Sequence, residues 1–164
     1  MSSWRPKEII VNEKVRDDPV TKRVIERCPG VPVKWVTSAR AQEVVAASEV
    51  LSRTPKGMLN SILAGKGVLF INAPGQVVDT FEMPDDRMVC PHFARLKLAA
   101  NGCFYRCDWC YLKLTYRAAF PFITIPADHE KILGQLERRL ARETGPVMFN
   151  SGELADSLAF DHLT

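Results

Sequence analysis

Apolar runs and amphipathic stretches alternate along the first half of the chain. Four apolar runs predict strands, at residues 8–11, 31–37, 68–71 and 77–81. Three stretches with apolar side chains at helical spacing predict helices, at residues 18–27, 38–53 and 58–64. Asp17 or Asp18 is suited to cap the first helix and Ser38 the second, because their side-chain oxygens accept hydrogen bonds from free helix amides. We expect the strand at 77–81 to pair with the strand before it.

The second half of the chain predicts a strand at 96–99, an amphipathic helix that begins after Asp128, and a strand at 147–149. A further helix is expected to open at Asp156 or Ser157. The order strand, helix, strand is typical of a βαβ unit, whose two strands are parallel. The strand at 96–99 delivers the chain to a loop at its carboxyl end, which is where an α/β barrel displays catalytic groups.

These elements together predict an α/β protein. We expect a small N-terminal α/β region over residues 1–89 and the start of a barrel over residues 90–164, with a polar linker at 84–87. Gly-Lys-Gly at 65–67 lacks the spacing of a phosphate-binding loop and precedes its strand, so we expect no nucleotide phosphate there.

The composition is that of a folded globular chain, with 46% hydrophobic and 25% charged residues among 164. The net charge of +3 permits an anionic partner without requiring one. Arg138, Arg139 and Arg142 form a basic helix face, which we interpret as a solvated surface. No apolar stretch reaches the roughly 18 residues needed to cross a membrane, and no secretory signal is visible. We therefore expect a cytoplasmic protein whose cysteines bind metal rather than form disulfides.

Three of the five cysteines, Cys103, Cys107 and Cys110, fall within eight residues. A loop this tight is able to turn three thiolates toward one point. Structural zinc takes four protein ligands, and an iron–sulfur cluster is usually held by four thiolates as well. Three cysteines would leave one iron of a [4Fe-4S] cluster without a protein ligand. Cys90 is the candidate for a fourth ligand, which would favour zinc or a closed cluster, whereas Cys28 is expected to be structural.

The spacing C-x3-C-x2-C, with Trp109 before the last cysteine, resembles that of the radical S-adenosylmethionine (SAM) enzymes. The resemblance implies a partial (β/α)6 barrel, a [4Fe-4S] cluster held by the three cysteines, and SAM bound at the open iron. In that family, reduction cleaves SAM to a 5′-deoxyadenosyl radical that abstracts hydrogen from the substrate. An electron donor of the flavodoxin or ferredoxin type is then implied as a partner.

Five further residues are expected to bind the cofactors: Tyr105, Trp109, Ser151, Gly152 and Glu153. By the same resemblance, Trp109 packs near the SAM adenine. Alternatively, Trp109 and Tyr105 wrap the cluster and shield it from solvent. Ser151-Gly152-Glu153 resembles the radical SAM element that receives the SAM ammonium, in which a carboxylate meets a cation and glycine allows close backbone approach.

Cys-Tyr-Leu at 110–112 and Asp-His-Leu-Thr at 161–164 together resemble the spore photoproduct lyase branch of the superfamily. This resemblance implies a lyase of DNA photoproduct repair, DNA as a partner, and Tyr111 as a catalytic residue. The sequence departs from the branch at Glu153, where relatives carry a hydrogen-donating cysteine. It also supplies about two of the six βα units, so we expect the chain to be a fragment of a longer product.

Two other hypotheses remain at this stage. One is a zinc-binding or nucleic-acid-binding module with Cys90, Cys103, Cys107 and Cys110 as ligands. The other is an inactive relative whose shortened barrel no longer holds SAM.

Overall fold

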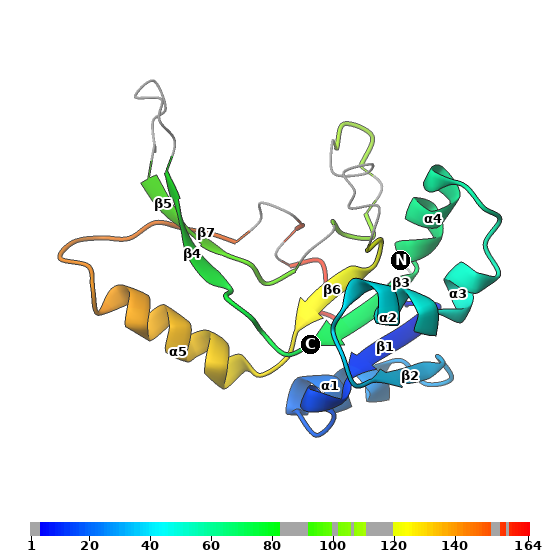
Figure 1. Cartoon of the computed structure of the whole chain (residues 1–164). Coiled ribbons are helices and arrows are strands. Elements are labelled where there is room, and N and C mark those ends of the chain that lie inside the picture. Colours follow the sequence, from blue (N-terminus) through cyan, green and yellow to red (C-terminus); the bar gives the residue numbers. More distant parts are fainter. Residues whose placement is uncertain are drawn as a thin grey trace.

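Four parallel strands form the central sheet of the protein, in the order β2-β1-β3-β6 (Figure 1). Their bounds in the computed structural model are Glu8–Asn12 for β1, Val33–Val36 for β2, Val68–Asn72 for β3 and Ile123–Pro126 for β6. The structure describes residues 4–82, 92–99, 102–105, 107–110, 120–151, 155–156 and 158–164. The strands predicted at 8–11, 31–37 and 68–71 are confirmed.

Both faces of this sheet are covered, and alternate residues of β1 show how. Ile9 and Val11 belong to one apolar cluster, which includes Val20 and Val24 of helix α1 (Pro19–Arg27). Ile10 belongs to a second cluster, which includes Val44 of helix α2 (Ala41–Ala47). Because successive side chains of a strand point to opposite faces, an unbroken apolar run is what a doubly covered parallel strand requires.

Strand β6 was not expected from the sequence. It has four residues, ends in a proline and pairs with β3 at the edge of the sheet, in the register Leu69 to Ile123. A run this short carries little pattern of its own, so its place is decided by pairing with β3. The division of the chain at residue 89 stays a prediction, although β6 joins a later segment to the first sheet.

A second, three-stranded sheet has the order β4-β5-β7. Its strands are β4 (Val78–Glu82), β5 (His92–Leu96) and β7 (Phe149–Asn150). The strand predicted at 77–81 therefore pairs antiparallel with β5, and the expected pairing with β3 is wrong. The strand predicted at 96–99 lies earlier in the chain. Helix α5 (His129–Leu140) connects to β7, which is parallel to β5 as the βαβ prediction required.

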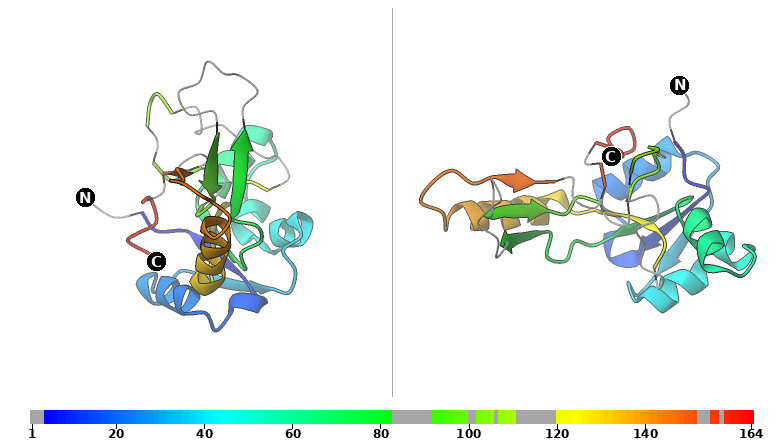
Figure 2. Two further views of the ribbon diagram at one scale, coloured as in Figure 1. Left: turned by 90° about the vertical axis from the view of Figure 1, so that its left-hand side faces the viewer. Right: turned by 90° about the horizontal axis from the view of Figure 1, so that it is seen from above.

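The two sheets lie at opposite ends of the molecule. Figure 2 shows the second sheet with α5 at one end, and the four-stranded sheet with its helices at the other. Asp18 links the two ends, since its Oδ1 caps α1 at the amide of Val20 (2.8 Å) and its Oδ2 accepts from the amide of Asp128 (2.9 Å). Asp128 in turn caps α5 at the amide of Lys131. The caps predicted at Asp18 and Asp128 are confirmed, whereas the cap predicted at Ser38 is wrong, because α2 begins after Arg40.

The single helix predicted over 38–53 is wrong, because the chain forms two helices there. These are α2 and α3 (Glu49–Ser52), and α2 begins after Arg40, without a side-chain cap. Ser48 separates them in an extended conformation and donates through its hydroxyl to the buried carboxylate of Glu8 at 2.6 Å. Ser48 also caps α3 at the amide of Leu51, so a local cap and a contact with a residue forty positions away meet at the break.

Helix α4 (Met58–Gly65) confirms the prediction at 58–64. The helix expected from Asp156 or Ser157 is not found, because residues 158–163 form successive turns. Ser157 itself lies outside the described residues. Within the described part of the chain, no helix is both long and apolar enough to cross a membrane.

Asp79 of β4 is held by two cations of the neighbouring strand and the segment after it. Its Oδ1 accepts from Nε of Arg95 at 2.7 Å and its Oδ2 from Nη2 at 2.8 Å, and Lys97 donates a third hydrogen bond. The bond from Arg95 lowers the pKa of Asp79, partial burial opposes this, and Lys97 lowers it further. The net effect is a pKa below the ordinary carboxyl value.

We expect Asp79→Asn to lower the free energy of unfolding by about 1–2 kcal/mol at about pH 6. A depressed folded-state pKa stabilises the fold above the unfolded-state value near 4, and that contribution is lost as the pH falls through the folded-state pKa. Urea unfolding should therefore show a smaller difference in unfolding free energy between Asp79→Asn and the parent protein at about pH 2.5 than at about pH 6. Asp17→Asn is the control, since that carboxylate is 89% exposed. An Asp79→Asn deficit that is equal at both pH values contradicts the prediction.

Candidate metal centre

The cysteine loop, defined as residues 102–105 and 107–110, follows β5 in the chain. It enters at Gly102, which is buried and has φ of +79°, a conformation that glycine adopts without strain. Cys103 is half-buried against the core of the four-stranded sheet, Cys107 is exposed, and Cys110 is half-buried. The amide of Cys110 donates to the carbonyl of Cys107 at 3.1 Å, so a tight turn holds these two residues together.

Lys66 is a cation that lies near two cysteines of this loop. It lies between α4 and β3 and is half-buried. Burial lowers the pKa of Lys66, and negative charge on Cys103 and Cys110 opposes that shift. Two of the three sulfur atoms thus lie close enough to one ammonium group to act on it.

Sequence reasoning missed Lys66, although its Gly-Lys-Gly setting is an unusual signal. The structure explains the first of these glycines by packing. A Cβ on Gly65 would lie 2.5 Å from the carbonyl oxygen of Pro121, so no larger residue fits where α4 approaches the segment before β6. This close approach sets the position of Lys66 at the end of α4.

An aromatic anchor, consisting of Trp4, Phe104, Phe160 and His162, holds the cysteine loop in place. Phe104 stacks on Trp4 with centroids 4.9 Å apart and contacts Phe160 and His162 edge-on at 5.7 and 5.6 Å. Nε2 of His162 lies 2.9 Å from the carbonyl oxygen of Trp4. The Asp-His-Leu-Thr stretch that carried the sequence resemblance therefore fastens the loop to the N-terminal segment.

We expect Phe104→Ala to lower the free energy of unfolding by about 2 kcal/mol, because it removes four ring contacts of a half-buried side chain. Trp109→Ala is the matched control, since that ring is 89% exposed and its loss should change stability by less than about 0.5 kcal/mol. Urea unfolding followed by circular dichroism measures both. Equal effects of the two substitutions would contradict the role of the anchor.

The three thiols do not converge on one point, contrary to the expectation from their spacing. Among the described residues, no group of three or more His, Cys, Asp or Glu side chains is placed to hold a single metal ion. A [4Fe-4S] cluster makes a different demand, because each of its thiolates binds a different iron. Three soft donors on one loop, two of them beside a lysine, fit that demand by their chemistry. Cys90, the candidate fourth zinc ligand, lies outside the described residues.

The residues expected to bind SAM are only partly described. Trp109 is 89% exposed and Tyr105 is 50% exposed, with its ring 4.3 Å from that of Phe104. Ser151 directly follows β7 and is half-buried. Gly152, Glu153 and Tyr111 lie outside the described residues, so their roles stay predictions.

Comparison with known proteins places the fold in one class. No family model matches the chain, and no curated protein does. The architecture is similar to that of the N-terminal part of spore photoproduct lyase. A doubly substituted variant of that lyase with bound AdoMet and dinucleoside spore photoproduct superimposes with a TM-score of 0.73 at 18% identity. The lyase complexed with dinucleoside spore photoproduct gives 0.72 at 19%.

Both matches cover 99% of this chain and 44% of the lyase chain. The chain thus spans less than half the length of these structures. The predicted resemblance is confirmed for the fold. It stays a prediction for the activity, because identities this low establish the fold alone.

Proposed function

We propose that this chain is the cluster-bearing part of a radical SAM enzyme of the spore photoproduct lyase-like branch. The observation that carries the proposal is the spacing of Cys103, Cys107 and Cys110 on a loop that follows β5, in a fold that superimposes on part of spore photoproduct lyase with a TM-score of 0.73. In this proposal Cys103, Cys107 and Cys110 hold a [4Fe-4S] cluster. When bound, the cluster supplies the electron that cleaves SAM reductively.

The residues of the chain have separate tasks in this proposal. Lys66 offsets part of the negative charge of the thiolates, which is costly in a half-buried site. Trp109, whose ring is exposed, is free to stack on the adenine of SAM. Ser151, Gly152 and Glu153 receive the SAM ammonium, and Tyr111 acts near the substrate. A flavodoxin-type or ferredoxin-type protein delivers the electron.

The proposed substrate is a photoproduct in DNA. The support is the likeness to structures of spore photoproduct lyase that contain dinucleoside spore photoproduct. Glu153 stands where the family carries a hydrogen-donating cysteine. The proposal for this chain therefore includes abstraction of a hydrogen atom from the substrate, and it does not include return of a hydrogen atom to the product.

Anaerobic reconstitution with iron and sulfide tests the proposal. We expect brown protein with about four irons per chain and, after dithionite reduction, release of 5′-deoxyadenosine from SAM. Colourless protein with one zinc per chain would contradict it and support the zinc module, in which Cys90→Ala should release the metal. Iron without cleavage of SAM would support the site and contradict the enzymatic step for this chain.

A further inference from the structure

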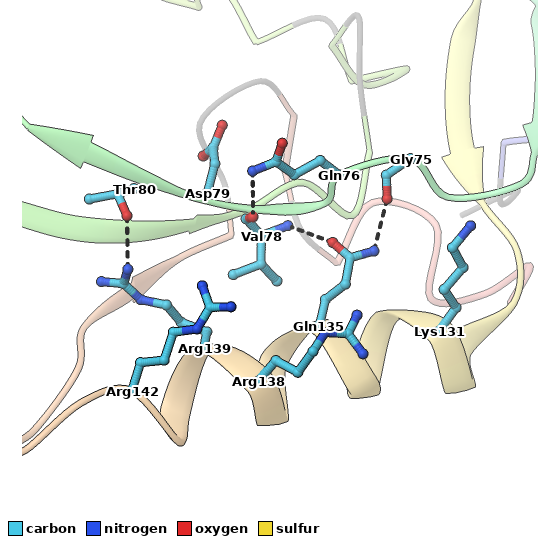
Figure 3. Close-up of a pocket in the computed structure, with 10 residues that line it drawn as sticks. All are labelled: Gly75, Gln76, Val78, Asp79, Thr80, Lys131, Gln135, Arg138, Arg139 and Arg142. Atoms are coloured by element: carbon cyan, nitrogen blue, oxygen red, sulfur yellow. Dashed lines mark hydrogen bonds between the residues drawn. The ribbon is translucent and has the colours of Figure 1, made fainter.

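A cavity of about 500 Å³ lies between α5 and the segment that includes β4, away from the cysteine loop (Figure 3). Ten residues line it: Gly75, Gln76, Val78, Asp79, Thr80, Lys131, Gln135, Arg138, Arg139 and Arg142. None of these residues belongs to the predicted SAM or cluster site. A volume of this size is typical of sites for small molecules.

Hydrogen bonds between the helix and the strand segment hold the cavity walls in place. The side chain of Gln135 accepts from the amide of Val77 at 2.9 Å and donates to the carbonyl of Gly75 at 2.8 Å. Nη1 of Arg139 donates to the hydroxyl of Thr80 at 2.9 Å (Figure 3). These bonds fix α5 against the β4 segment and set the shape of the cavity.

The charge on the cavity walls is strongly positive and largely uncompensated. Four cations and one carboxylate line the cavity. The carboxylate, Asp79, forms ion pairs with Arg95 and Lys97, so it does not neutralise the four cations. Within the described part of the chain, the side chains of Lys131, Arg138 and Arg142 have no hydrogen-bond or ion-pair partner.

Arg139 also lines the cavity, and its guanidinium group has partners of its own. Its Nη2 pairs with Glu143 at 2.7 Å and its Nη1 with Thr80.

Helix stability does not account for this charge. Cations in the last turn of a helix interact favourably with the helix dipole. This interaction explains Arg138 and Arg139, which lie in the last turn of α5. Lys131 lies in the first turn, where the dipole opposes a cation. Arg138 and Arg142 are four residues apart and repel each other. The interpretation of this face as merely solvated leaves both features unexplained.

We propose that the α5–β4 cavity binds a small ligand with two or three linked phosphoryl groups, at a site separate from the proposed SAM site. Arg138, Arg139 and Arg142 fall within about one helical turn, some 6 Å along the axis, a span that suits linked phosphates. Guanidinium groups bind phosphate oxygens in pairs, which gives such a site geometric selectivity. Lys131 lies about 10 Å further along the helix and contacts the far end of the ligand.

Titration calorimetry of the full chain with inorganic tripolyphosphate, at about 50 mM salt, tests the proposal. We expect a dissociation constant below about 1 mM. Arg138→Gln/Arg142→Gln should weaken binding at least tenfold, and Lys131→Gln about threefold. The matched control is Arg23→Gln/Lys56→Gln, which removes two exposed charges elsewhere and should leave binding unchanged.

Three results would overturn the proposal: no binding of tripolyphosphate, equal weakening by the cavity and control variants, or binding of a single-stranded oligonucleotide that tripolyphosphate does not displace. Equal weakening would indicate attraction by net charge, and the oligonucleotide result would indicate a nucleic-acid track. If the Arg138→Gln/Arg142→Gln variant does not fold, the Lys131→Gln variant tests the site instead. Unchanged binding of tripolyphosphate by Lys131→Gln would then contradict the proposal. The outcome is independent of iron content, so it fails or succeeds separately from the proposed function.

Discussion

Alanine at Cys103, Cys107 or Cys110 is expected to abolish release of 5′-deoxyadenosine, by more than about 100-fold for each single substitution. Loss of a residue that only supports a metal ligand typically costs about 10- to 100-fold, so loss of a ligand itself should cost more. Each thiolate binds its own iron, and the two that remain cannot replace the third. The measurements are iron and sulfide per chain after reconstitution, and nucleoside release under dithionite.

Cys28→Ala is the matched control for these substitutions. Cys28 is 2% exposed in the core of the four-stranded sheet, and burial raises the pKa of its thiol, with Arg5 opposing this shift. A buried protonated thiol is a poor metal ligand, so this variant should keep its iron. Retention of full iron content by any of the three loop variants would contradict the assigned ligand set.

Glu8→Ala is expected to lower the free energy of unfolding by about 3 kcal/mol. Glu8 begins β1 and is 1% exposed. Its carboxylate accepts from the hydroxyl of Ser48 at 2.6 Å and from the amide of Glu49 at 2.9 Å, and it also lies 3.4 Å from the amide of Val50. Removing a buried charged acceptor leaves these donors unsatisfied, which costs more than the bonds contribute when made.

Equilibrium urea unfolding of Glu8→Ala and Glu26→Ala separates this effect from a general loss of carboxylate charge. Glu26 lies on an exposed position of α1, so its substitution should change stability by less than about 0.5 kcal/mol. Glu8→Gln keeps the shape and one acceptor, and we expect an intermediate loss. A Glu8→Ala variant as stable as Glu26→Ala would contradict the role of this carboxylate in placing α3.

The elements that the sequence predicted correctly are those whose signal is local. The apolar runs of β1 and β3 and the Asp18 and Asp128 caps each lie within a few residues of what they specify. The wrong predictions depended on distant partners. At the break between α2 and α3, Ser48 contacts Glu8 of β1, and β4 pairs with β5 rather than with the strand before it.

The candidate site also combines features with a local sequence signal and features that depend on distant segments. The spacing of the three cysteines is a sequence property, and their role as cluster ligands stays a prediction. Lys66 and three members of the aromatic anchor come from segments far from the loop, and no local pattern connects them to it: Trp4, Phe160 and His162.

The sequence by itself determined the α/β class, the parallel βαβ unit and the thiol chemistry of one loop, because hydrophobic period, helix caps and ligand spacing act over a few residues. Only the tertiary structure decided that β6 completes the first sheet, that Lys66 stands beside two thiols, and that Lys131, Arg138, Arg139 and Arg142 face β4 across a cavity. These features arise from contacts between segments about forty to sixty residues apart, whose free energy depends on packing that no single stretch encodes.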